Sequence, residues 1–354
     1  LGFGGRDLSF IDSLKGWYGV VAPLGVLFCI LLGGDSVSRF VKNTVYLSLF
    51  AISIGIILDS VLGLQFGKYL SPNDDSMVKF ADNSYRASFI FDSPMAAGYL
   101  MAFTSFFSLI LASCVSGRRL YTLALYTLSV VSALSCFLTF SRGGLMVLFL
   151  SLFLYYLRRI NLGTTIQAVA IIVAFCLIAS ASPSARDWAL TVVDFKTEAS
   201  NELRKESWIS SYNLISESDV FGHGIGSLRN PQLRKDISIS TGAESTILYA
   251  GVEGGVFWAT VTGALYVYLF FRFAIFWFLS GKLFVQSLLL QRIHLALICF
   301  CIASISYSFT FPMFVEKLTP LIMFLSFGLA LRLQRDPFRV DNSDAVGLQM
   351  VSTS

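Results

Sequence analysis

Charged side chains are scarce in this 354-residue chain. Asp, Glu, Lys and Arg make up 14% of the residues, whereas a soluble protein usually carries roughly a quarter. The formal net charge is only +4 and no long basic run occurs, which argues against a nucleic-acid-binding protein. Hydrophobic residues make up 55%, and this excludes intrinsic disorder, which combines low hydrophobicity with high net charge.

Histidine and cysteine are also few. The two histidines, His223 and His294, stand far apart in sequence, so a histidine-based metal centre is not expected, although an ion held by carboxylates stays open. The six cysteines form no CxxC pair and are too few for a disulfide-stapled domain of this length. All lie inside apolar stretches, where small lipid-facing or core residues are expected: Cys29, Cys114, Cys136, Cys176, Cys299 and Cys301.

Long apolar runs, by contrast, recur along the whole chain. A helix needs roughly 20 mostly apolar residues to cross the bilayer core, and a β-barrel would show short alternating segments instead. The sequence therefore predicts an all-α polytopic membrane protein, and we expect the ambiguous stretch 273–291 to lie along the cytoplasmic face. About nine transmembrane helices are predicted, near residues 17–33, 43–63, 94–115, 120–140, 144–157, 165–182, 246–271, 293–314 and 319–333.

Lys and Arg in short loops assign the two sides of the membrane. If the spans alternate, one set of loops carries most of these residues and is assigned to the cytoplasm. We then expect four parts: an N-terminal transmembrane bundle (1–182), an outer catalytic loop (183–245), C-terminal transmembrane helices (246–335) and a cytoplasmic tail (336–354). Alternation places residues 1–16 outside, and because the chain starts at Leu1, we expect an upstream segment with an odd number of helices.

The outer loop contains a predicted amphipathic helix between residues 198 and 215. Trp208, Tyr212 and Ile215 recur at helical spacing, and Arg204 shares the face of Trp208. We expect this helix to lie along the outer membrane surface, with Trp208 at the level of the lipid headgroups.

A glycine-rich turn follows, with the sequence Phe221-Gly222-His223-Gly224-Ile225-Gly226-Ser227. It follows no obvious strand, so a dinucleotide-binding fold is a poor interpretation. Two others stay open: a tight turn between helices, or exposed amides that contact a phosphate. His223 is either structural or catalytic.

Arginines and carboxylates gather on the predicted outer side. Arg142 stands where one span ends and the next begins, and it either binds an anion or reaches lipid phosphate. Several arginines on one face predict an anionic ligand, because guanidinium binds phosphate bidentately and stays charged. They can also replace a metal in stabilising a pyrophosphate leaving group. Glu253 falls inside a span, beyond Glu244 at its edge, and is either functional or a buried structural carboxylate.

These motifs, in this order, resemble the O-antigen ligase and polymerase superfamily of bacterial inner-membrane glycosyltransferases. The resemblance covers residues 85–260 and rests on five pieces: Arg86 with Phe91-Asp92-Ser93-Pro94, Ser141-Arg142-Gly143-Gly144, Arg204 with Trp208, Gly222-His223-Gly224-Ile225-Gly226, and Glu244-Ser245 with Glu253-Gly254.

The resemblance implies a donor glycan on undecaprenyl pyrophosphate, presented at the periplasmic face, and no cofactor or metal. An acceptor hydroxyl attacks the anomeric carbon and the lipid pyrophosphate leaves. Implied partners are this glycan, membrane lipids, and a chain-length regulator and flippase of the same pathway. Arg142, Arg204 and Glu244 are the expected catalytic residues, and the expected substrate-binding residues are Arg86, Arg229, Ser245 and Glu253.

One position departs from the ligases of this family. Ligases carry His-Asn before the span that follows the large loop, whereas this chain has Glu244-Ser245. This favours a polymerase, with a ligase as the nearest alternative and a lipid-linked sugar transporter as the alternative of another class. Glu244 is a general base, a sugar-binding residue or a structural residue.

Overall fold

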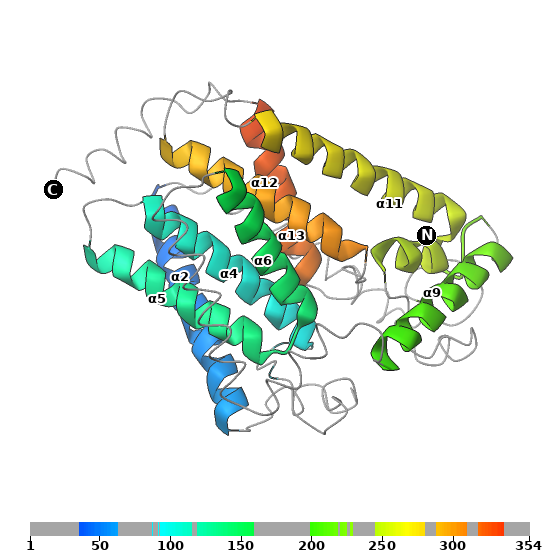
Figure 1. Cartoon of the computed structure of the whole chain (residues 1–354), viewed down its shortest axis with the longest axis horizontal. Coiled ribbons are helices and arrows are strands. Elements are labelled where there is room, and N and C mark those ends of the chain that lie inside the picture. Colours follow the sequence, from blue (N-terminus) through cyan, green and yellow to red (C-terminus); the bar gives the residue numbers. More distant parts are fainter. Residues whose placement is uncertain are drawn as a thin grey trace. The chain divides into compact units, whose positions relative to one another are not determined.

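The structure consists of helices joined by turns. The computed structural model describes residues 35–62, 87, 91, 93–114, 119–158, 199–218, 220–224, 227–228, 245–279, 288–309 and 318–335, and these ranges contain no strand. The all-α prediction is therefore confirmed for them. The helices, shown in Figure 1, are α2 (Asp35–Leu62), α4 (Pro94–Cys114), α5 (Arg119–Leu138), α6 (Arg142–Arg158), α9 (Ala199–Glu217), α11 (Thr246–Leu279), α12 (Leu288–Ser308) and α13 (Leu318–Arg335).

Seven of these helices coincide with predicted spans, and the chain is a multi-pass membrane protein. In the described ranges four helices are long and apolar enough to cross a bilayer: Pro94–Cys114, Arg119–Leu138, Thr246–Leu279 and Gln291–Ser308. The predicted spans 17–33 and 165–182 lie outside the described residues, so the count of nine is not confirmed. Helix α11 continues into the stretch 273–291 as far as Leu279, and the assignment of this stretch to the cytoplasmic face remains a prediction.

The chain forms two compact units. The bundle unit comprises Ser36–Ile160, Arg272–Ala303 and Ile322–Ser354, and the loop unit comprises Leu1–Asp35, Asn161–Phe271 and Ser304–Leu321. The predicted divisions after residues 182, 245 and 335 remain predictions.

Buried hydroxyl groups join α2, α4 and α5 in the bundle unit. Ser53 on α2 lies 2.9 Å from the Ser132 hydroxyl of α5, and Ser135 donates to the Ser53 carbonyl over 2.8 Å. Ser129 of α5 donates to the carbonyl of Ser105 on α4 over 2.9 Å. Small hydroxyl side chains let helices approach closely and still satisfy their polar groups, which suits packing inside a membrane.

Two glycines bring α4 and α6 into backbone contact near their first residues. A Cβ atom added to Gly144 would lie 2.7 Å from the carbonyl carbon of Gly98, and one added to Gly98 would lie 2.6 Å from Cβ of Ser141. Cys136 donates a hydrogen bond to the Gly98 carbonyl at the same crossing, with Sγ 3.3 Å from the oxygen. Since both helices start at this crossing, α4 and α6 run in the same direction.

Arginine side chains close the opposite end of the bundle unit. Arg158, the last residue of α6, donates to the Phe278 carbonyl near the end of α11 over 2.9 Å. Arg292 donates to the Ser113 carbonyl near the end of α4 over 2.7 Å. Cations near helix C-termini are stabilising. Because α4 and α6 are parallel, these two arginines share one end, in agreement with the prediction that they lie on one side.

Gly144→Ala is expected to destabilise the bundle unit by about 1–3 kcal/mol, because the new methyl group meets backbone atoms that cannot rotate away. Gly328→Ala in α13 is the matched control, since no atom lies within 4 Å of its added Cβ. Thermal unfolding of both variants in detergent measures the effect. Equal midpoints for Gly144→Ala and Gly328→Ala would show that the close crossing does not contribute to stability.

In the loop unit, α9 packs against the first part of α11. The helix confirms the prediction of a helical segment here, and of the predicted apolar stripe only Ile215 is buried in the protein. Ser207, Ser211 and Ile215 are buried, whereas Trp208 and Tyr212 are 40% and 67% exposed. The serines are small enough to let α9 lie close to its neighbours, so they occupy the inner face. That Trp208 lies among lipid headgroups remains a prediction.

Helix α11 is broken at Gly255, where the backbone has φ +75° and ψ −174°. Its two parts fold back on each other, because residues equally distant from Gly255 are neighbours. A Cβ on Gly251 would lie 3.1 Å from Cβ of Ala259, and a Cβ on Gly263 would lie 3.8 Å from Cδ1 of Ile247. The change of direction is visible in Figure 1. The predicted span 246–271 therefore coincides with a helix that is interrupted at Gly255.

Candidate functional site

Arg142 is the first residue of α6 and follows a tight turn in the bundle unit. The backbone of Phe140 has φ +48°, a conformation uncommon outside glycine, and Thr139 Oγ1 accepts from the Ser141 amide at 3.3 Å. Ser141 caps α6, since its hydroxyl accepts from the Gly144 amide at 3.2 Å. The turn and the glycine crossing beneath it fix the point from which the half-buried Arg142 side chain starts.

A cation at this position is unfavourable for the helix alone. The N-terminal end of a helix carries partial positive charge, so an arginine in its first turn is repelled rather than stabilised, typically by about 0.3–1 kcal/mol. Arg142 therefore adds a positive charge to the helix end that already carries partial positive charge. This arrangement suits an anion with several acceptor oxygens.

Asp59 of α2 is a buried carboxylate that the motif analysis missed. It is fully buried and lies inside an apolar helix, where an ionisable residue is a functional candidate. Tyr46 packs against Tyr121 and Ser53 contacts Ser132, so α2 and α5 run parallel. Asp59 therefore lies toward the end of the bundle unit at which α5 ends and α6 begins. Asp59 is the single carboxylate in the apolar run 43–63, and this could have been noticed in the sequence.

The glycine-rich turn docks into the break of α11 in the loop unit. The His223 and Gly224 amides each donate over 2.9 Å, to the carbonyls of Val252 and Glu253 respectively. These carbonyls lose their helical partners where α11 breaks, so the turn satisfies them. Two of the amides proposed to contact a phosphate are thus used internally. The structure supports the alternative interpretation, a tight turn between helices.

Gly222→Ala is expected to disrupt this junction. Gly222 has φ +68°, and an added Cβ would collide with the amide nitrogen of Gly255 and the carbonyl carbon of Glu253. Gly224→Ala is the control. Gly224 has φ +97° and no atom lies within 4 Å of its added Cβ, so this substitution costs only the backbone strain of about 1–2 kcal/mol. Gly222→Ala should therefore lower the thermal midpoint by more than Gly224→Ala. Equal shifts would contradict the docking of the turn.

The remaining predicted residues are placed as follows. Ser245, which directly precedes α11, and Glu253, near the break of α11, are buried at 5% and 9% exposure. Arg204 lies within α9, in the same loop unit. Ser93 caps α4, since its hydroxyl accepts from the Met95 amide at 3.1 Å. Three predicted site residues lie outside the described ranges, Arg86, Arg229 and Glu244, as does Asp92 of the Phe91–Pro94 motif.

Polar side chains of the loop unit also include buried atoms without a hydrogen-bond partner among the described residues. These atoms are the hydroxyls of Ser211 and Ser227 and Nε2 of His223. In the described ranges, no group of three or more His, Cys, Asp or Glu side chains is placed to hold a metal ion.

Comparison with known families assigns the central part of the chain. Residues 127–262 match the family described as O-antigen ligase. The match supports membership of the O-antigen ligase and polymerase superfamily. No curated protein matches the chain significantly. The matched segment of the superfamily contains Arg142, α9, the glycine-rich turn and the first part of α11, so both described parts of the candidate site fall within it.

Members of the O-antigen ligase family are glycosyltransferase-like enzymes, which supports an enzymatic role for this chain. Six of the seven predicted site residues lie in the matched segment, and only Arg86 precedes it. The resemblance found in the sequence motifs is therefore confirmed at the level of the superfamily.

Proposed function

We propose that the protein is a glycosyltransferase that polymerises oligosaccharide repeat units carried on undecaprenyl pyrophosphate. The active site faces the periplasmic side of the bacterial inner membrane. The observation that carries the proposal is the Ser141–Arg142 turn, which lies inside the O-antigen ligase match. Its capped, strained backbone and the Gly98–Gly144 crossing hold a guanidinium at a helix start, where an anion is the fitting ligand.

The proposed reaction forms one glycosidic bond and breaks one. An acceptor hydroxyl attacks the anomeric carbon of the donor, and the bond from that carbon to the lipid pyrophosphate breaks. Arg142 and Arg204 stabilise the departing pyrophosphate, whose negative charge increases as the bond breaks. Glu244 accepts the proton of the attacking hydroxyl. Arg86, Arg229, Ser245 and Glu253 bind the sugar and phosphate groups.

The polymerase assignment rests on Glu244-Ser245, which stand where ligases carry His-Asn. A polymerase must produce a growing glycan on one lipid and a free lipid pyrophosphate. A flippase that delivers the donor and a protein that limits chain length are the proposed partners. Transfer of the finished glycan to a lipid core, which defines a ligase, is the second candidate function supported by the family match.

Reconstitution with a synthetic undecaprenyl-pyrophosphate repeat unit tests the proposal. A ladder of products from the donor alone supports a polymerase. A single transfer that requires a lipid A-core acceptor identifies a ligase. Movement of the donor across the bilayer without a covalent product contradicts both enzymatic functions and indicates a transporter.

Chelation is expected to leave the activity unchanged, because arginines rather than a metal are proposed to stabilise the leaving group. The measurement is the initial rate of product formation with and without EDTA, each followed by addition of excess Mg²⁺. A strong loss that Mg²⁺ reverses would contradict the proposed role of the arginines.

A further inference from the structure

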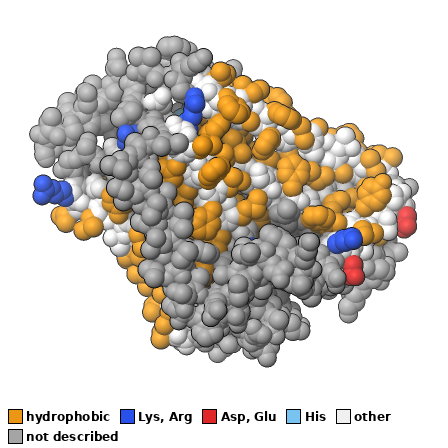
Figure 2. All heavy atoms as spheres, in the orientation of Figure 1, with side chains coloured by type: hydrophobic (Ala, Val, Ile, Leu, Met, Phe, Trp, Pro, Cys, Tyr) orange, Lys and Arg blue, Asp and Glu red, His pale blue; other side chains and the backbone are white. Residues whose placement is uncertain are grey.

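The break at Gly255 divides α11 into a short first part and a second part that is long enough to span the membrane. The second part, from Val256 to Leu279, contains 24 residues and rises about 36 Å, enough to cross a hydrocarbon core of about 30 Å by itself. Hydrophobic side chains exposed along it include Phe257, Val261 and Leu265, and Figure 2 shows such side chains over this face. The first part, Thr246–Gly254, is therefore not needed to complete the span.

The folded-back arrangement fixes the depth of the first part. Thr246 and Ser308 are hydrogen-bonded through their side chains to the phenolic oxygen of Tyr266. Tyr266 is eleven residues beyond Gly255, roughly 16 Å along the helix axis, and so lies near the middle of the spanning part. This depth holds whichever end of the span faces outward. Thr246 shares it, whereas Glu253 lies beside the break.

The sequence had predicted the reverse order, with residue 244 at the membrane edge and Glu253 deeper. The pairing of Ile247 with Gly263 and of Gly251 with Ala259 favours the opposite order, in which the chain approaches Gly255 from within the span. Such a start is tolerated at membrane depth only when protein covers it. Ser245 is 5% exposed and Thr246 is fully buried, as this requirement demands.

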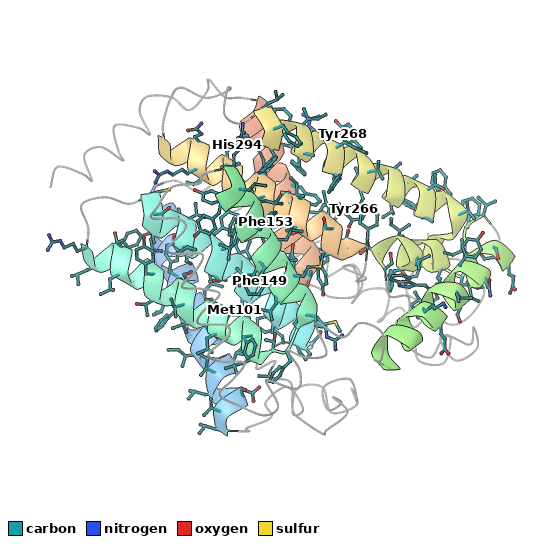
Figure 3. The ribbon with its side chains drawn as sticks, viewed as in Figure 1. Met101, Phe149, Phe153, Tyr266, Tyr268 and His294 are labelled. Carbon is teal, nitrogen blue, oxygen red and sulfur yellow. The ribbon has the colours of Figure 1, made fainter. Side chains whose placement is uncertain are left out.

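We propose that Tyr266 is a positioning residue that holds the start of α11, Ser245 and Thr246, inside the membrane near its mid-plane. The inference rests on the proposed function in one respect: Glu244, the proposed general base, directly precedes Ser245. Tyr266 is 2% exposed, and its ring lies 6.5 Å from that of Phe309. Figure 3 shows Tyr266 on the side of α11 that faces the end of α12, and Tyr268 pointing away from it.

The hydroxyl of Tyr266 is the group that matters. Ser308 also donates to the Ile305 carbonyl over 2.7 Å, so it keeps a partner when the phenol is removed. The contact between Tyr266 and Thr246 is a polar contact between the start of α11 and the span, beside the apolar pairing of Ile247 with Gly263. Removing the Tyr266 hydroxyl takes this partner from Thr246, and an unsatisfied hydroxyl in hydrocarbon is costly. Loss of the contact therefore loosens the start of α11.

Tyr266→Phe tests the inference, with Tyr268→Phe as the matched control because Tyr268 is 55% exposed. Tyr266→Phe should lower kcat by about tenfold to a hundredfold and leave the donor KM unchanged, as expected when a catalytic group is displaced but the donor still binds. Tyr268→Phe should turn over like the wild type. Equal kcat values for the two variants would overturn the positioning role.

Cysteine labelling measures the depth independently of activity. Ser245→Cys and Val220→Cys are treated with a membrane-impermeant maleimide, and the labelling of the parent chain is subtracted. Val220 is 63% exposed and should react rapidly, whereas position 245 should be protected and should become reactive when Tyr266→Phe is added. Equal rates at the two positions would overturn the depth assignment. Because labelling requires no substrate, it decides the inference even if the proposed glycan transfer is not observed.

Discussion

Arg142→Ala is expected to abolish product formation while the protein still inserts into the membrane. The side chain stands at the start of α6 on a turn held by Ser141 and Thr139, and no other described residue is held in this arrangement. Loss of a positioned group that stabilises developing charge typically costs about a hundredfold to a thousandfold in rate. Arg142→Lys should fail as well, since an ammonium cannot contact a phosphate with two parallel hydrogen bonds.

Arg119→Ala supplies the matched control. Arg119 is also the first residue of a helix, α5, but it is exposed and lies at the opposite end of the bundle unit. Both variants remove a cation from a helix start, so any effect of the helix dipole is common to them. Rates are compared in proteoliposomes at equal amounts of inserted protein. Normal product formation by Arg142→Ala would refute the role of this residue in binding the pyrophosphate.

Glu244→Gln is expected to lower turnover by about a hundredfold to ten-thousandfold, the range that general-base catalysis contributes. Glutamine keeps the size of the side chain but accepts no proton. In the wild type, activity should fall as the pH is lowered, because the base acts only when deprotonated. In Glu244→Gln this acid limb should disappear.

The control for Glu244→Gln is Glu206→Gln, which removes an exposed carboxylate of α9. It should retain both the rate and the acid limb. The measurement is kcat over a range of pH with saturating donor. An unchanged acid limb in Glu244→Gln would assign the proton transfer to another group and leave Glu244 a binding or structural role.

Composition and hydropathy were sufficient to predict the helices of the bundle unit. The apolar runs 94–115 and 120–140 became α4 and α5 within two residues at each end, because a span needs length and hydrophobicity and little else. The Ser141–Gly144 motif was also recognised. Its structural basis was not, since the contact with Gly98 depends on a residue more than forty positions earlier.

The fold of α11 could not be predicted from hydropathy, because apolar residues continue on both sides of Gly255. The adjacent glycines 254 and 255 and a helix of 34 residues, longer than a span requires, were the available signals. The inner face of α9 was not predicted, because its apolar stripe was assigned to the membrane surface. Periodicity weighted large apolar residues, whereas Ile215 packs against Gly251 of α11 and the other buried residues on its face are small serines.

The central claim is that the chain forms glycosidic bonds with lipid pyrophosphate as the leaving group. The most direct measurement is the amount of lipid pyrophosphate released per glycosidic bond in proteoliposomes supplied with the donor alone. The account predicts equal amounts of the two products for the wild type and for Arg119→Ala, and neither product for Arg142→Ala. Donor that crosses the bilayer intact, with no pyrophosphate released by the wild type, would contradict it.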